Sequence, residues 1–111
     1  MKLIDESILN IVPKDELNGL GSKGLGWLVR DRWGGVDFSK AGNIHDATYY
    51  IIGWYNYPDA DKRIIKANKV FYQNLCIINE AKSKTRVGRY LRKPILFLYY
   101  MGVKIFGRFF V

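Results

Sequence analysis

Residues 59–81 read DADKRIIKANKVFYQNLCIINEA, and the spacing of their apolar side chains decides the fold class. Steps of four and three residues separate the members of one face, which are Ile64, Asn68, Phe71, Leu75 and Ile78. The spacing predicts an amphipathic helix over 59–81, because residues three and four apart share one side of an α-helix. One member of this face is polar, so the predicted buried side carries a hydrogen-bonding group.

Two more helices are predicted on either side of this one. The first runs from Ala41 to about Ile52, with Ser39 as its N-cap and Gly53 at its end. The stretch GWYNYP then forms a turn, so residues 41–81 form an antiparallel helix pair. The third helix occupies 86–110 and restarts at Pro94, because proline is tolerated in a first helical turn. We therefore predict a mainly α protein.

The segment 1–40 is predicted to be rich in loops. It contains six glycines within seventeen residues: Gly19, Gly21, Gly24, Gly26, Gly34 and Gly35. This density argues against a long helix and favours backbone that turns sharply or closely approaches another group. At 111 residues, the chain has the length of a single domain spanning 1–111.

The positive charge is concentrated at the C-terminal end. Residues 1–80 hold ten basic and ten acidic side chains, whereas the residues after Glu80 hold eight basic and no acidic ones. On a helix, a basic stripe is formed by Arg86, Arg89, Lys93, Lys104 and Arg108. The apolar run PILFLYYMGV beside it is about half as long as the roughly 20 residues that span a membrane. The segment is then either a core helix with a solvated basic edge or an interfacial helix for anionic lipid.

The cellular compartment is predicted from the single cysteine, Cys76, which cannot form an intrachain disulfide. A secreted domain of this size usually needs disulfides, so we expect a reducing compartment. The N-terminal MKLIDES places two acids before any hydrophobic run, unlike a signal peptide. We expect a cytoplasmic protein or one peripheral to a membrane.

The stretch AGNIHDATYY, residues 41–50, holds the only histidine. His45 and Tyr49 lie one turn apart on a helix, and Asp46 lies about 100° around the axis. A histidine that deprotonates water needs its other ring nitrogen held by an acceptor, and a neighbouring carboxylate can bind a hard cation such as calcium. The alternative is a buried, hydrogen-bonded histidine without chemistry.

GNIHDATYY resembles the active-site helix of the phospholipase A2 superfamily, whose signature is Cys-x-x-His-Asp-x-Cys-Tyr. His45, Asp46 and Tyr49 match that signature, and Gly42 and Thr48 replace its two cysteines. The loss of both cysteines makes the chain similar to compact bacterial, phage and parvovirus-capsid members rather than to secreted animal enzymes. The resemblance covers roughly residues 24–75.

The resemblance implies hydrolysis of the sn-2 ester of glycerophospholipids. His45 would be the general base and Asp46 a calcium ligand. Loop carbonyls would supply further ligands, either around Trp33–Gly35 or in the earlier Gly24–Gly26 stretch. Calcium would hold the phosphate and stabilise the oxyanion.

In that family a second acid on the neighbouring helix accepts a hydrogen bond from the histidine, and two residues compete for this place. If the first helix ends near Ile52, the level of His45 on the next helix falls at 65–68, which favours Asn68 over Asp61. An amide can fix the histidine tautomer but cannot offset imidazolium charge, so catalysis should be weakened. Tyr49 would brace Asn68 through a hydrogen bond.

Other functions compete with the enzyme. The chain could be an inactive phospholipase-fold protein that docks its basic C-terminal surface on an acidic protein, a nucleic acid or a membrane. Purely nucleic-acid binding explains the charge but not HDATY, and no base-reading motif is present. Three tryptophans could form a rim at a lipid surface or pack in the interior: Trp27, Trp33 and Trp54.

Overall fold

The computed structural model describes residues 2–12, 32–33, 35–55 and 57–106. Three helices dominate these residues, α1 (Ser39–Tyr55), α2 (Ala60–Lys82) and α3 (Arg86–Phe106). They are preceded by a short 3-10 helix, η1 (Glu6–Asn10), and an antiparallel hairpin of β1 (Arg32–Trp33) and β2 (Val36–Asp37). The mainly α prediction is confirmed, and no helix among the described residues is long and apolar enough to cross a membrane.

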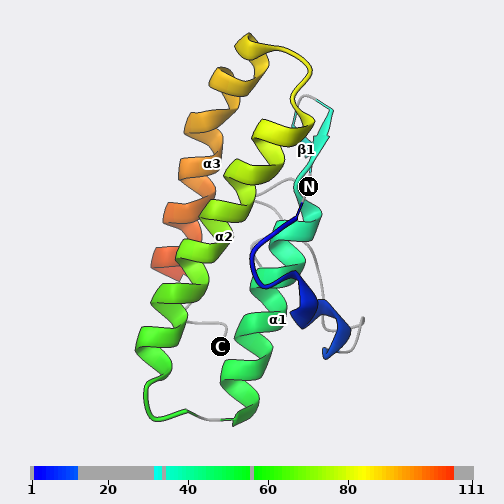
Figure 1. The fold of residues 1–111 in the computed structure, drawn as a ribbon. Helices are drawn as coiled ribbons and strands as arrows, with labels where there is room; N and C mark the ends of the chain where they lie inside the picture. The colour runs from blue at the N-terminus through cyan, green and yellow to red at the C-terminus, as the bar shows by residue number, and fades with distance from the viewer. Residues whose placement is uncertain (1, 13–31, 34, 56, 107–111) are drawn as a thin grey trace.

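Helix α2 lies between the other two long helices, and each neighbour runs antiparallel to it (Figure 1). The face predicted from spacing is the buried one: Ile64, Asn68, Phe71, Leu75 and Ile78 are at most 7% exposed. Two clusters form the interior. One joins α2 to α1, β2 and α3 around Leu75, and the other joins α1 to the start of α2 around Ile52 and Ile64.

The N-terminal segment is tied to the middle of α2 by one side chain. Asn74 is fully buried, accepts the backbone N–H of Ile4 at 2.7 Å and donates to the Ile4 carbonyl at 3.0 Å. Lys40 in the first turn of α1 pairs with Glu6 in η1. The segment therefore covers α1 and α2 rather than hanging free of them.

Several predicted helix limits were wrong. Helix α1 begins at Ser39 itself, after Asp37 accepts the Ser39 backbone N–H at 2.9 Å, and it continues through Gly53 to Tyr55. Helix α3 does not restart at Pro94 but runs through it. Proline removes one N–H donor inside a helix. Pro94 and Tyr90, whose carbonyl loses that donor, are both exposed, so water can take its place.

The described residues among the first 40 include the short elements η1, β1 and β2. The hairpin pairs Trp33 with Val36, and Gly35 has a φ of +83°, which a side chain would strain. The Gly24–Gly26 stretch, Trp27 and Arg108 lie outside the described residues.

Candidate functional site

The antiparallel pairing of α1 and α2 places His45 opposite Asn68. Both side chains are buried, with 7% and 4% of their surface exposed. His45 lies between α1's buried Ala41 and Tyr49, and Asn68 lies on the buried face of α2. Two polar groups that are brought together inside a helix interface must satisfy each other, because an unpaired buried polar group is destabilising by about 1–3 kcal/mol.

The amide oxygen of Asn68 accepts two hydrogen bonds. His45 Nε2 lies 2.9 Å from Asn68 Oδ1, and the Tyr49 hydroxyl donates to the same oxygen at 2.6 Å. An amide oxygen only accepts, so the proton of the neutral imidazole resides on Nε2. This leaves His45 Nδ1 as the nitrogen able to accept a proton.

Aromatic rings surround the imidazole. The ring centroids of Tyr49 and Phe71 lie 4.2 Å and 4.9 Å from that of His45. Burial lowers the pKa of His45 from 6.5 to about 4, and the hydrogen bond to Asn68 only partly opposes this effect. The low-dielectric surroundings disfavour imidazolium, so His45 is neutral at pH 7.

The unprotonated nitrogen, Nδ1, makes no hydrogen bond to another described residue. Within the described part of the chain, no fully buried side-chain nitrogen or oxygen lacks a hydrogen bond. A small part of the His45 surface is exposed to solvent. A water molecule at this nitrogen could therefore be deprotonated by it.

An apolar cavity of about 190 Å³ lies next to this group, between α1, α2 and η1. It is lined by Thr48 and Ala67, which directly precede Tyr49 and Asn68 in sequence. Asp5, Arg63 and Lys66 also line it. The cavity thus combines apolar walls with charged side chains of both signs.

The expected calcium ligands lie on different elements: Trp33 in β1, Gly35 between β1 and β2, and Asp46 in α1. Asp46 is half-buried on α1, and no group of three or more His, Cys, Asp or Glu side chains that could hold a metal exists among the described residues. Gly35 lines a different cavity with Lys82, Lys84 and Arg92, which disfavours a cation there. The strand residue Trp33 precedes this turn.

The competing partner, Asp61, is exposed in the first turn of α2 and is not the residue that contacts His45.

The basic residues of α3 differ in exposure. Arg86, Lys93 and Lys104 are exposed, whereas Arg89 is half-buried and pairs with Glu80 at 2.9 Å.

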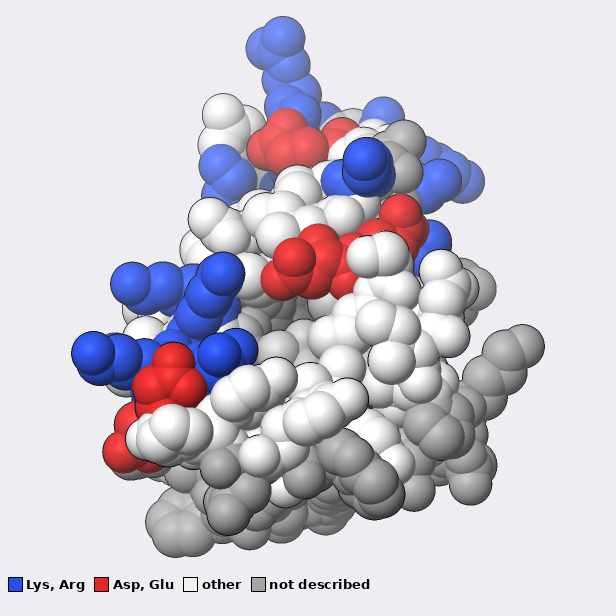
Figure 2. Space-filling view, turned by 60° about the horizontal axis from the view of Figure 1, so that its bottom comes forward, with Lys and Arg blue, Asp and Glu red and all other residues white. Residues whose placement is uncertain are grey.

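The space-filling view that brings the α1–α2 turn forward shows no single basic patch (Figure 2). Lysines and arginines form separate groups there, with acidic side chains beside them (Figure 2). On this face, positive charge is therefore partly neutralised by its neighbours.

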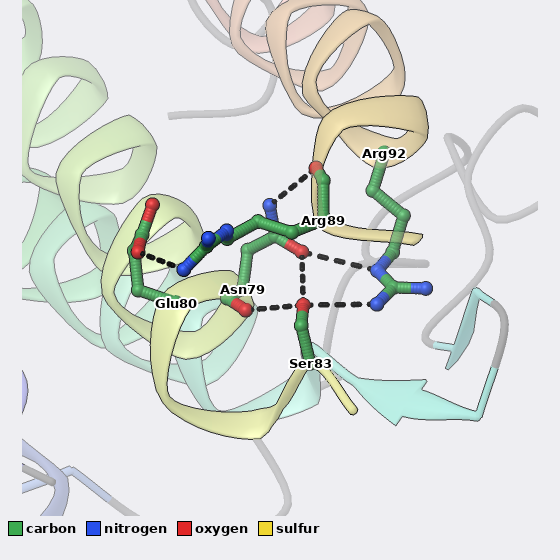
Figure 3. A network of polar contacts seen from close by, with 5 residues as sticks. All are labelled: Asn79, Glu80, Ser83, Arg89 and Arg92. Carbon is green, nitrogen blue, oxygen red and sulfur yellow. Dashed lines mark hydrogen bonds and ion pairs between the residues drawn. The ribbon is translucent and has the colours of Figure 1, made fainter. Parts of the chain in front are cut away.

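Sequence reasoning missed Arg92, which is only 9% exposed. Its Nε donates to Asn79 Oδ1 at 3.0 Å and its Nη2 to Ser83 Oγ at 2.9 Å (Figure 3). The available signal was its spacing, because Arg92 lies four and seven residues before the buried Leu96 and Tyr99. That spacing puts the guanidinium on the inner face of α3.

Comparisons with protein-family models, with curated proteins and with solved structures found no match for this chain.

Proposed function

We propose that the protein is a slow phospholipase A2-like hydrolase that cleaves the sn-2 ester of glycerophospholipids. The observation that carries this proposal is the hydrogen bond between His45 Nε2 and Asn68 Oδ1. Because an amide oxygen accepts, this bond holds the proton on Nε2 and leaves Nδ1 able to accept one. The likeness of HDATY to the phospholipase A2 signature supplies the reaction class.

In the proposed reaction, His45 Nδ1 takes a proton from water while the water oxygen attacks the ester carbonyl. The tetrahedral intermediate then collapses, and the proton on Nδ1 passes to the leaving glycerol oxygen. Tyr49 and Asn68 do not touch the substrate in this scheme. They are positioning residues, because their hydrogen bonds fix the tautomer and direction of the ring.

The same geometry predicts a low rate. Asn68 is neutral, so it offsets none of the imidazolium charge that develops during proton transfer. A histidine with a pKa of about 4 is also a weak base at neutral pH. We therefore expect turnover to be limited by the basicity of His45 rather than by the position of its ring.

Calcium is part of the proposal through the resemblance alone. Asp46 would hold the ion and would need further oxygen ligands. Those oxygens would come from carbonyls around Trp33–Gly35 or in the Gly24–Gly26 stretch, and Gly35 lines a basic cavity, which disfavours a cation there. Calcium bound by Asp46 would supply charge stabilisation for the phosphate and the oxyanion.

The test is release of fatty acid from phosphatidylglycerol and phosphatidylcholine liposomes, with calcium or with a chelator. We expect slow, calcium-dependent release that His45→Gln reduces at least 100-fold, because a base contributes about 10²–10⁴ in rate. Gln73→Ala, on the exposed side of α2, is the matched control and should keep full activity. Equal turnover in His45→Gln, or turnover that ignores calcium, would contradict the proposed site.

A second candidate is a catalytically inactive binding protein, and exposed side chains of α3 favour it. Val87, Leu91 and Leu98 are each more than 60% exposed, and Lys93 and Lys104 are exposed on the same helix. Such a surface would bind an anionic membrane or an acidic partner. This reading predicts no fatty-acid release, together with vesicle binding that weakens steeply as salt is raised.

A further inference from the structure

A second cavity lies at the other end of the molecule, between the β1–β2 turn and the α2–α3 junction. Its volume is about 250 Å³, and it is lined by Gly35, Val36, Lys82, Lys84, Thr85 and Arg92. Lys82 lies fourteen residues beyond Asn68 on α2, which at 1.5 Å per residue is a separation of about 20 Å. The cavity is therefore separate from the His45 site.

Arg92 is the buried charged residue of this lining. Its two hydrogen-bond acceptors, Asn79 Oδ1 and Ser83 Oγ, are both neutral. The nearby acid, Glu80, is engaged by Arg89 instead (Figure 3). A buried cation with only neutral partners is unfavourable unless an anion compensates it.

The guanidinium of Arg92 packs against the backbone of α3 at Gly88. A Cβ on Gly88 would lie 3.1 Å and 3.2 Å from Arg92 Nη2 and Nη1, so the glycine makes room for the planar group. Thr85 Oγ1 accepts the Gly88 N–H at 3.0 Å and thereby caps the first turn of α3. Two hydrogen bonds and this support fix the direction of the remaining nitrogen, Nη1, before any ligand arrives.

The charged residues that line the cavity in the described part of the chain are all basic. Lys82 and Lys84 are exposed lysines of the lining, and none of the described lining residues is acidic. The start of α3 adds the positive end of a 21-residue helix. A volume of about 250 Å³ lies below the roughly 300–1,000 Å³ of sites for larger organic ligands. Size and charge thus both favour a small anion.

We propose that the cavity between the β1–β2 turn and the α2–α3 junction binds a phosphate group through Arg92, Lys82 and Lys84. Arg92 presents a rigid, pre-positioned donor, and the two lysines act as mobile point charges at the mouth. The group can be free phosphate or the headgroup of a phosphatidate-type lipid, since both present the same oxygens. The site does not depend on hydrolysis at His45.

The test measures binding of inorganic phosphate to the full-length chain by calorimetry, at constant ionic strength with chloride as the reference anion. The pocket variant is Lys82→Gln with Lys84→Gln. The matched control is Lys62→Gln with Lys69→Gln, which removes the same charge from exposed positions elsewhere on α2. A further variant, Arg92→Lys, keeps the charge but loses the planar donor.

We expect saturable phosphate binding that the pocket variant and Arg92→Lys weaken at least tenfold, with the control variant within twofold of the wild type. A parallel flotation assay uses vesicles of phosphatidylcholine with or without phosphatidate. Saturable calorimetric binding identifies free phosphate as the ligand. If free phosphate does not bind but the wild type binds phosphatidate vesicles more tightly than the pocket variant does, the ligand is the lipid headgroup. If neither probe binds, or if both double variants weaken binding equally, the proposal is wrong.

Discussion

Replacing Asn68 with aspartate tests the geometry of the site most directly. The new carboxylate would take the position of Oδ1, which lies 2.9 Å from His45 Nε2. Two unit charges about 4 Å apart attract by about 4 kcal/mol at an effective dielectric constant of about 20. Raising the pKa of His45 from about 4 to its ordinary 6.5 requires about 3 kcal/mol. The attraction is therefore large enough to bring the pKa of His45 close to its ordinary value.

The measurement is simple because His45 is the only histidine in the chain. Proton NMR of the imidazole Hε1 resonance follows its pKa without any assignment problem. We expect the wild type to titrate near pH 4 and Asn68→Asp to titrate at least one pH unit higher. Fatty-acid release should rise about tenfold or more in the same variant, because a stronger base accelerates proton transfer.

The control removes the other candidate carboxylate. Asp61→Asn should leave the titration of His45 unchanged, since Asp61 is exposed and is not the residue in contact with the ring. A wild-type pKa near 6.5 would refute the buried imidazole. An Asn68→Asp variant with an unchanged pKa would refute the contact itself.

The remaining predictions concern stability and are measured by chemical or thermal unfolding. Because folding lowers the pKa of His45, the unfolded chain binds more protons than the folded chain between pH 4 and 6.5. The contribution of His45 to the free energy of unfolding is therefore complete above pH 6.5 and falls by about 3 kcal/mol as the pH drops to 4. The variant His45→Gln should lose this part of the pH dependence. Gly88→Ala should lower the free energy of unfolding by about 1–3 kcal/mol, because the new Cβ crowds the Arg92 guanidinium. Gly102→Ala has open space around its Cβ and should raise the free energy of unfolding by up to about 1 kcal/mol. Asn74→Ala should lower the free energy of unfolding by about 2–3 kcal/mol, because two backbone groups of the N-terminal segment lose their partner. The neighbouring, exposed Gln73→Ala should change it by less than about 0.5 kcal/mol. Equal effects of Gly88→Ala and Gly102→Ala, or of Asn74→Ala and Gln73→Ala, would contradict the packing described.

Helix periodicity alone predicted the central element and its inner face. Spacing of four and three residues identifies which side of α2 is buried, because burial follows the helical repeat wherever one face meets a core. The same regular rise per residue placed Asn68, not Asp61, at the level of His45. These features depend on local geometry that every α-helix shares, so they can be derived without coordinates. The catalytic and calcium roles remain predictions.

Tertiary contacts decided where the helices end and which charged group is buried. Gly53 and Pro94 usually terminate helices, but packing of α1 and α3 against α2 carries both helices past them. The burial of Arg92 depends on acceptors from the end of α2, Asn79 and Ser83, which are nine to thirteen residues away. Local sequence determines periodicity and hence the face of a helix. Only the assembled structure determines which groups are available to compensate a charge on that face.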